Sequence, residues 1–140
     1  MTKHARPYYN CNMLTVEWSE DRRLLDGLSR AIFDCSARDL CGAVLSCDGV
    51  YCGVAFYGVG ECIHIKSVGI LPEYRGKGYG DFFTRTLIYK FMFYNKDIVV
   101  DYHDDYYINL GFVSDGDGSM RASCDDVVFP SGCGHTGGSR

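Results

Sequence analysis

The feature that most restricts how this chain can fold is the glycine-rich stretch LPEYRGKGYGDFF at residues 71–83. An apolar, β-prone run at 62–71 leads into it, and the segment after it, 82–96, carries apolar residues at helical spacing. In a strand–loop–helix unit with a glycine-rich loop, several backbone N–H groups and the positive end of the helix point toward one place. The order therefore predicts an α/β unit with a phosphate site where the helix begins.

Three further segments supply strands for this unit. The runs at 40–47 and 50–57 flank an Asp-Gly pair, which is typical of a hairpin with a type I′ turn. A short, fully apolar run at 97–101 follows the central helix, as in a buried strand reached by a parallel crossover. We therefore expect a mixed, mostly antiparallel sheet flanked by helices, splayed where the strand at 62–71 passes the strand at 97–101.

Smaller elements complete the predicted domain. Ser19 is the expected cap of a first helix over 20–35, whose apolar residues recur along one face. The stretch DDYYINLGF predicts a short helix ended by Gly111, and a closing hairpin follows it. We expect one domain over 1–130 and a loose, Gly-rich tail at 131–140.

Composition argues against several classes of partner. The chain has 14 Lys and Arg residues against 18 Asp and Glu, which gives a formal net charge of -4. We therefore expect no non-specific electrostatic binding to nucleic acid or to a membrane. The N-terminal stretch lacks the apolar core of a secretory signal, and polar residues or glycine interrupt every apolar run before it reaches the length of a membrane span. The expectation is a soluble, cytoplasmic protein.

The 8 cysteines raise two alternatives, a disulfide framework or a metal site. No C-x-x-C pair is present, and the nearest neighbours, Cys47 and Cys52, are five residues apart. Without paired ligand spacing we expect no structural metal site. Four of the cysteines lie in predicted strands, where a reduced thiol behaves as a small buried hydrophobe. These four are Cys41, Cys47, Cys52 and Cys62.

The glycine loop departs from two common phosphate-binding motifs. Tyr79 stands where the Walker pattern G-x-x-x-x-G-K-[ST] needs Lys, so a triphosphate and Mg²⁺ site is not indicated. The dinucleotide pattern G-x-G-x-x-G fails because Asp81 and Phe83 occupy the positions of its third glycine in the two alternative registers. The pattern that remains is R-x-x-G-x-G, running from Arg75 to Gly80.

The segment SVGILPEYRGKGYGDFF resembles motif A of the GNAT superfamily of N-acetyltransferases, whose pyrophosphate loop reads R/Q-x-x-G-x-G/A. DDYYINLGF is similar to the family's F-Y-x-x-x-G-F segment. The resemblance implies a GNAT-like fold that binds acetyl-CoA as acyl donor, without a metal. It also implies that the loop amides hold the pyrophosphate and that the preceding strand pairs with the pantetheine arm. The residues so assigned are Val68, Gly69, Ile70, Arg75, Gly76, Lys77, Gly78, Tyr79 and Gly80.

By the same resemblance, a tyrosine serves as general acid. The departing CoA thiolate must be protonated, and a phenol with an ordinary pKa near 10 can supply the proton. Tyr107 lies four residues before Gly111 and matches the tyrosine that the family commonly uses for this step. The alternatives are that Tyr107 packs in the core while Tyr106 faces the site, or that Tyr102 serves instead.

A general base is also required, because a primary amine must lose a proton before it attacks the thioester. His64 lies eleven residues before Arg75, where several family members carry a catalytic Glu or His. Strict alternation places His64 on the same side of its strand as Val68 and Ile70, unless a bulge intervenes, as it often does in the family. Glu61 with a water chain is the alternative base.

The sequence thus predicts an acetyl-CoA-dependent N-acetyltransferase that transfers the acetyl group directly, in a ternary complex, to a small-molecule or peptide amine. Asp101, Asp104 and Asp105 around His103, and Asp115 and Asp117 further along the chain, either attract a cationic amine or form a solvated surface. The alternative function is a non-catalytic acyl-CoA-binding sensor or scaffold, and a general phosphate binder is a third. The sequence leaves the acceptor and the oligomeric state open, a homodimer included.

Overall fold

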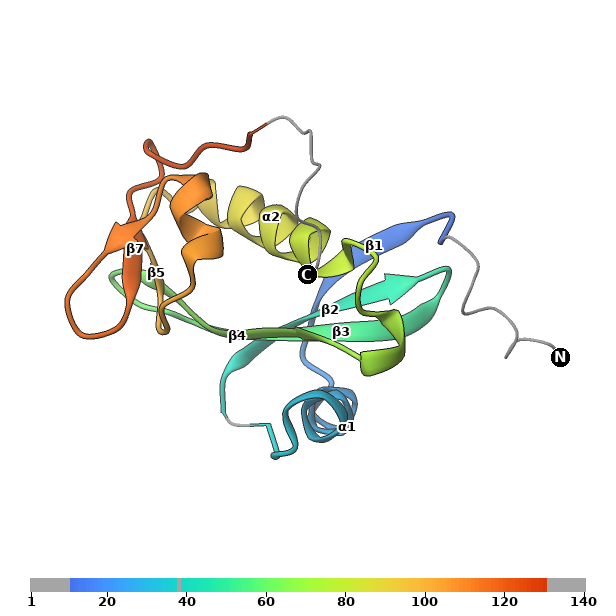
Figure 1. Ribbon diagram of the computed structural model, residues 1–140. Helices are drawn as coiled ribbons and strands as arrows, with labels where there is room; N and C mark the ends of the chain where they lie inside the picture. The colour runs from blue at the N-terminus through green and yellow to red at the C-terminus, as the bar shows by residue number, and fades with distance from the viewer. Residues whose placement is uncertain (1–10, 38, 131–140) are drawn as a thin grey trace, which may run out of the picture.

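The computed structural model describes residues 11–37 and 39–130. In this part of the chain seven strands form one sheet, with helix α1 on one face and helix α2 on the other (Figure 1). The elements in chain order are β1 (Leu14–Ser19), α1 (Arg22–Phe33), β2 (Cys41–Cys47), β3 (Val50–Val59), β4 (Ile63–Ile70), the 3-10 helix η2 (Pro72–Tyr74), α2 (Tyr79–Met92), β5 (Ile98–Val100), the 3-10 helix η3 (Asp105–Leu110), β6 (Val113–Ser114) and β7 (Met120–Ala122).

The sheet is antiparallel except for one pair of strands. Its order is β1-β2-β3-β4-β5-β7-β6, and β4 and β5 form the parallel pair. Their pairing covers only residues 63–65 of β4 and 98–100 of β5, so the sheet splays open beyond Ile65. This mixed, mostly antiparallel architecture between helices confirms the predicted fold class.

The β2–β3 hairpin turns where the sequence predicts. Asp48 and Gly49 have φ values of 51° and 87°, as the two central residues of a type I′ turn require. The Asp48 carboxylate also accepts hydrogen bonds from the backbone N–H groups of Asn12 and Met13, at 3.2 and 2.9 Å. The turn therefore holds the segment that leads into β1.

Strand β1 is an element that the sequence analysis did not predict, and its presence corrects the start of the first helix. Ser19 is the last residue of β1 and pairs with Gly42, so it does not cap the helix. Asp21 is the N-cap instead, because its carboxylate accepts hydrogen bonds from the N–H groups of Arg23 and Leu24. The helix consequently begins at Arg22.

A β-bulge in β4 decides which face each of its side chains occupies. Ser67 lies opposite Phe56 of β3, but Ile65 lies opposite Tyr57, so Lys66 is the extra residue on β4. Before the bulge the odd-numbered isoleucines enter the core under α2, whereas after it the even-numbered Ile70 does. The strict alternation that would place His64 with Val68 and Ile70 is therefore broken, and His64 lies on the opposite face.

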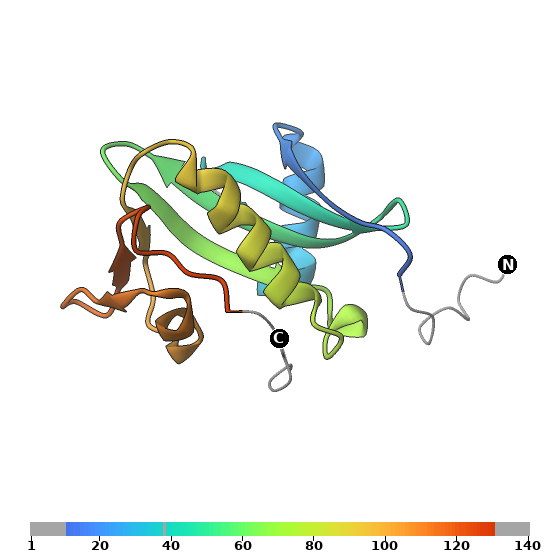
Figure 2. The same ribbon diagram turned by 90° about the horizontal axis from the view of Figure 1, so that it is seen from above.

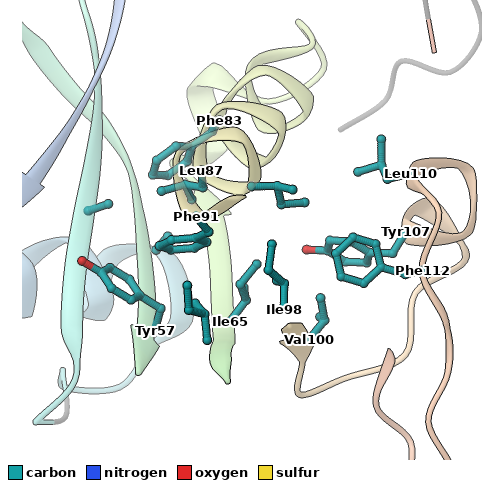
Figure 3. Close-up of a cluster of buried hydrophobic side chains, with 14 of the residues drawn as sticks. Tyr57, Ile65, Phe83, Leu87, Phe91, Ile98, Val100, Tyr107, Leu110 and Phe112 are labelled. Atoms are coloured by element: carbon teal, nitrogen blue, oxygen red, sulfur yellow. The ribbon is translucent and has the colours of Figure 1, made fainter. Parts of the chain in front are cut away.

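Most of the core lies between the sheet and α2, which crosses the sheet obliquely (Figure 2). Phe83, Leu87 and Phe91 of α2 are at most 1% exposed and face Ile65 and Ile98 of the central strands (Figure 3). Each of these buried side chains contributes about 1.5–3 kcal/mol from the removal of apolar surface from water. The helical face predicted from their four-residue spacing is confirmed.

The last described elements follow the predicted order. η3 ends at Gly111, which has a φ of 96°, and β6 and β7 form the closing hairpin. The predicted tail at 131–140 lies outside the described residues. None of the helices in the described chain is long and apolar enough to cross a membrane.

The cysteines only partly follow the expectation that strand thiols are buried. Every cysteine in the described chain is free, and Cys52 is fully buried as expected. Cys41, the first residue of β2, is exposed at the edge of an open pocket that Trp18 and Tyr57 also line, so the expected burial is wrong there. Cys133 lies outside the described residues.

Two glycine substitutions test the backbone of this fold. Gly111→Ala should lower the free energy of unfolding by more than ~2 kcal/mol, because an L residue is strained at this φ and its Cβ would lie 2.2 Å from the carbonyl oxygen of Asp126. The matched control is Gly27→Ala on α1, where a Cβ meets nothing within 4 Å, and it should raise stability by about 0.5–1 kcal/mol. Urea unfolding of the two variants measures both effects, and equal stability of Gly111→Ala and wild type would contradict the assigned conformation.

Candidate functional site

The loop between β4 and α2 has the backbone of an anion site. Gly76 and Gly78 have φ values of 80° and 84°, a conformation that favours glycine. A Cβ added at either position would meet nothing within 4 Å, so the loop faces open space. Gly78 is the N-cap of α2 and offers no side chain to the first-turn amides of the helix. Those N–H groups therefore remain available to an external acceptor.

Arg75 joins this loop to the end of β4. Its Nε donates a 2.8 Å hydrogen bond to the carbonyl oxygen of Ile70. This bond turns the guanidinium back over the strand end, beside the glycines. Lys77 is exposed on the same loop and adds a second positive charge.

A pocket of about 310 Å³ lies where β4, the loop and both helices meet. It brings together five of the nine residues predicted to bind the donor: Val68, Gly69, Ile70, Arg75 and Gly80. It adds three that the sequence analysis missed: Ile32, Phe33 and Thr84. Of these three, only Thr84 had a sequence signal, because it lies one helical turn after Gly80 on α2.

The end of α1 approaches the pocket because residue 69 is a glycine. A Cβ at Gly69 would lie 2.5 Å from Cγ2 of Ile32 and 2.7 Å from Cε1 of Phe33. Any other residue would push α1 away from β4. This glycine is therefore required by close packing of the helix rather than by its own φ.

The donor-facing edge of β4 lacks a partner strand. β5 stops pairing at Ile65, so residues 67–70 are bonded to β3 on one side and, within the described chain, to no strand on the other. An extended ligand segment with amide groups can add to such an edge as a strand would. The pocket thus combines an unpaired strand edge with an anion loop.

The remaining residues predicted to bind the donor do not line this pocket. Gly76 and Gly78 shape the loop, and Lys77 is exposed beside them. Tyr79 is buried and points elsewhere, since its hydroxyl accepts a 3.2 Å hydrogen bond from the N–H of Cys11.

Tyr107 is fully buried on η3. Its hydroxyl lies 2.6 Å from the hydroxyl of Tyr102, and its ring packs against Tyr106 and Phe112. In Figure 3 the hydroxyl points into the core toward Ile98 of β5. Tyr107 is therefore held by a phenol pair next to the point where β4 and β5 separate.

Tyr106 has a different environment from its neighbour. Its hydroxyl donates to the Asp81 carboxylate in the first turn of α2. The two tyrosines that the sequence left as alternatives thus occupy distinct positions. Tyr106 ties η3 to the helix that follows the glycine loop, and Tyr107 lies under the sheet splay.

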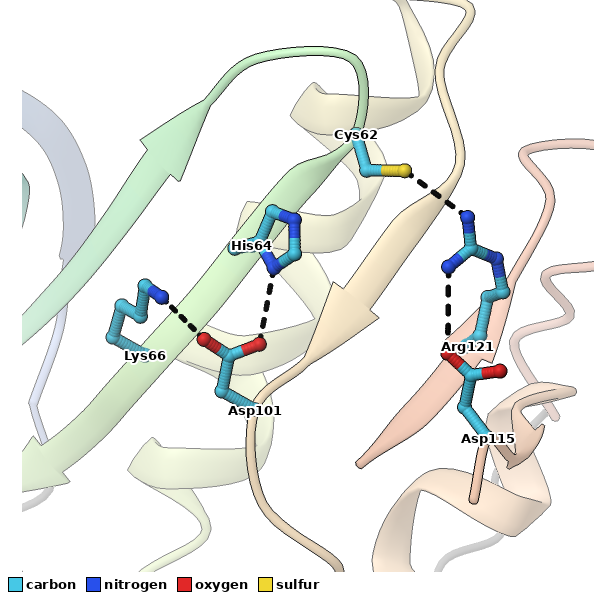
Figure 4. A network of polar contacts seen from close by, with 6 residues as sticks. All are labelled: Cys62, His64, Lys66, Asp101, Asp115 and Arg121. Carbon is cyan, nitrogen blue, oxygen red and sulfur yellow. Dashed lines mark hydrogen bonds and ion pairs between the residues drawn. The ribbon is translucent and has the colours of Figure 1, made fainter. Parts of the chain in front are cut away.

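His64 is partly exposed and is oriented by a carboxylate (Figure 4). Its Nδ1 lies 3.1 Å from Oδ1 of Asp101, and Lys66 donates to the other oxygen of the same carboxylate. Partial burial raises the pKa of Asp101, but the hydrogen bonds from Lys66 and His64 outweigh it, so the pKa lies below its ordinary value of 3.8. With Asp101 ionised, Nδ1 is the donor and Nε2 is left as the basic nitrogen of the ring.

The segment after β5 links the two candidate catalytic residues. Asp101 contacts His64, and the next residue, Tyr102, contacts Tyr107. The chain here ends its parallel pairing with β4, because β5 stops at Val100. The sequence analysis named Asp101 only as part of an acidic surface and missed its contact with His64.

Several of the acidic residues predicted near the mouth of the site have structural partners. Asp104 caps η3 by accepting from the N–H of Tyr106, and Asp105 lies 3.8 Å from His103. Asp115 forms an ion pair with Arg121 at 3.4 Å (Figure 4). These contacts favour a structural over a recruiting role for Asp104 and Asp115.

Comparison with solved structures identifies proteins of the same fold. A GNAT family acetyltransferase from Brucella melitensis in complex with acetyl-CoA superposes with a TM-score of 0.63, at 14% identity over 79% of this chain and 88% of the other. The ribosomal-protein-S18-alanine N-acetyltransferase from Escherichia coli gives 0.64 at 13% identity, over 88% of this chain and 100% of the other. A GNAT family N-acetyltransferase from Escherichia coli in complex with CoA gives 0.62 at 16% identity, over 80% and 81%.

No protein-family model and no curated protein matches the sequence itself. The structural likeness nevertheless covers most of the described chain. The protein therefore has the GNAT acetyltransferase fold, as the glycine loop predicts.

The Asp101 contacts give a pH dependence of stability. Because the pKa of Asp101 is lower in the folded than in the unfolded protein, its ionised form stabilises the fold above about pH 4, and this contribution is lost as pH falls through the lowered value. Asp101→Asn should therefore lower the melting temperature most near neutral pH and progressively less below about pH 4. Circular dichroism melts measure the difference, with the exposed Asp125→Asn as control. A deficit that stays constant into acid would contradict this account.

Proposed function

We propose that this protein is an acetyl-CoA-dependent N-acetyltransferase that transfers the acetyl group directly to an amine within a ternary complex. The observation that carries the proposal is the convergence of the unpaired β4 edge, the glycine loop and the start of α2 on one pocket. A phosphate-binding loop alone would suit many nucleotides. The adjoining strand edge suits a ligand that continues from its phosphates into an extended chain of amides, as CoA does.

The chain's own groups divide the binding of the donor between them. The loop glycines and the first-turn amides of α2 would hold the pyrophosphate, with Arg75 and Lys77 supplying positive charge. The backbone at Val68, Gly69 and Ile70 would pair with the pantetheine amides. When bound, acetyl-CoA supplies an activated acyl group as a thioester.

His64 would act as the general base. An amine with a pKa of 10.4 is neutral about once in 2,500 molecules at pH 7, so proton removal is a large part of the barrier. Asp101 accepts a hydrogen bond from Nδ1 of His64 and so favours the tautomer in which the proton is on Nδ1. In that tautomer Nε2 can accept the amine proton, either directly or through one water molecule. The base therefore has its orienting group in place, while Glu61 in the exposed β3–β4 turn is the alternative.

Tyr107 would act as the general acid. Its phenol shares a hydrogen bond with Tyr102, which can return a proton after Tyr107 donates its own to the departing thiolate. No cysteine among the described residues lines the pocket, which supports direct transfer over an acyl-enzyme route. The acceptor is a small-molecule or peptide amine.

A non-catalytic acyl-CoA sensor is the second candidate function. The observation that favours it is the complete burial of Tyr107, which would then serve the core alone. The two candidates share the donor site and differ only in turnover. Their separation therefore needs a binding measurement and a kinetic one.

The donor site is tested by thermal melts with acetyl-CoA and with ADP. Acetyl-CoA at about 100 times its Kd should stabilise the fold by about 2.7 kcal/mol, a shift of several degrees. ADP should shift the melt much less, because it lacks the pantetheine arm that the β4 edge would pair with. Equal shifts would indicate a general nucleotide site, and no shift at millimolar acetyl-CoA would rule out both candidate functions.

The acid is tested by replacing Tyr107 with Phe, which keeps the buried ring and removes only the hydroxyl. Once an accepted amine has been found by mass spectrometry of acetylated products, Tyr107→Phe should lower kcat by about 10²–10⁴-fold with donor affinity unchanged. Tyr102→Phe is the matched control, since it breaks the same hydrogen bond and leaves the acid, so its loss should be much smaller. A wild-type rate in Tyr107→Phe would contradict the acid role.

The same kinetic assay examines the base. His64→Gln should lower kcat/KM and remove its dependence on pH, whereas Asp101→Asn should lower the rate and retain that dependence. If His64→Gln keeps the wild-type pH profile, the base is another group, with Glu61→Gln as the next variant to measure.

A further inference from the structure

A second group of reactive side chains lies outside the pocket, at the β2–β3 turn. The sulfur atoms of Cys11 and Cys47 and a carboxylate oxygen of Asp48 all lie within 4.8 Å of one another. Cys47 ends β2, Asp48 begins the turn, and Cys11 comes from the segment ahead of β1. Three potential metal ligands thus converge from two separate parts of the chain.

The fold brings these ligands together through its own hydrogen bonds. Leu14 pairs with Cys47 in the β1–β2 ladder, which places the start of β1 beside the end of β2. The N–H of Asp48 donates to the carbonyl of Met13 at 2.9 Å, and the Asp48 carboxylate accepts from the backbone N–H of Met13 in return. These backbone contacts hold the segment that carries Cys11 over the turn, and the Cys11 thiol itself donates a 3.1 Å hydrogen bond to the carbonyl oxygen of Met13.

We propose that Cys11, Cys47 and Asp48 form a binding site for a thiophilic divalent cation such as Zn²⁺. Tetrahedral coordination with Zn–S distances of about 2.3 Å places two sulfur ligands about 3.8 Å apart, so the three atoms need only small movements to close on one ion. The fourth position is left to water. Two thiolates and one carboxylate are a donor set that zinc accepts and that magnesium and calcium do not favour.

The site is accessible and its charge can be balanced. Both thiols are partly exposed and Asp48 is exposed, so an ion can enter from solvent. Burial raises the pKa of Cys47 to about 11, and the neighbouring Cys11 thiol adds to the shift, so the Cys47 thiol is protonated when no cation is present. On binding, each thiol releases its proton to solvent and the cation neutralises the sulfur left behind.

An ion at this place would stabilise the start of α2. The N–H of Cys11 donates to the hydroxyl of Tyr79, the first residue of α2 and the neighbour of the loop glycine Gly78. An ion that holds Cys11 in place therefore also holds in place the N–H group that donates to the Tyr79 hydroxyl. Tyr79 does not line the pocket, so the role of the ion is structural and separate from the proposed transfer reaction.

Alkylation with and without zinc tests the site in the unaltered, reduced full chain. Equimolar Zn²⁺ should protect Cys11 and Cys47 from iodoacetamide at least about tenfold, as read by peptide mass spectrometry, since a coordinated thiolate is a poor nucleophile. The exposed Cys35 and Cys41 are internal controls and should react equally in both samples. Equal alkylation of Cys11 and Cys47 with and without zinc, protection of other cysteines instead, or a Cys11–Cys47 disulfide persisting under reductant would each overturn the proposal.

Native mass spectrometry provides the second measurement. Wild type and the control Cys35→Ser should each carry one zinc ion after removal of excess metal, and the double variant Cys11→Ser, Cys47→Ser should carry none. A zinc ion retained by a folded double variant would overturn the proposal. If that variant does not fold, the alkylation of wild type decides the question alone, and neither result depends on acetyl-CoA binding or turnover.

Discussion

The early separation of β4 from β5 is the constraint on which the rest of the structure depends. The two strands share only three paired positions before they diverge. A longer parallel ladder would satisfy the edge of β4 at residues 67–70 and leave no unpaired backbone beside the glycine loop. Helix α2 keeps the two strands apart, because it packs over the point where they diverge and buries Phe83, Leu87 and Phe91 against both of them. A hydrophobic core thus holds open a polar strand edge.

The bulge at Lys66 decides which side chains of β4 lie beside this opening. The extra residue shifts the alternation of β4 side chains by one position, so that the isoleucines before and after the bulge all point into the core. His64 is consequently directed to the other face, where Asp101 at the end of β5 can reach it. The following residue, Tyr102, turns the opposite way and meets Tyr107. One short segment therefore positions a base candidate and an acid candidate on the two sides of the splay.

Electrostatics at this site are local rather than global. The chain carries a formal net charge of -4, yet the loop presents Arg75 and Lys77 together with the amides of a helix start. Such a site can hold a polyanion without a basic surface, because backbone N–H groups at a helix N-terminus attract anions through their partial positive charge and add no net charge to the protein. The acidic residues nearby are largely committed to caps and ion pairs, including those made by Asp104 and Asp115. These carboxylates therefore have structural partners within the fold.

The sequence by itself determined the features that depend on neighbouring residues. Glycine at 76 and 78, the Asp-Gly turn, the helical spacing of α2 and the glycine that ends η3 each follow from local backbone preference or periodicity, and the structure has all of them. Only the tertiary structure decided the rest. Strand β1, the bulge, the Asp101 contact to His64 across 37 residues, and the meeting of Cys11 with Cys47 depend on strand register. Register is set by how side chains pack between distant segments, and no local pattern encodes it.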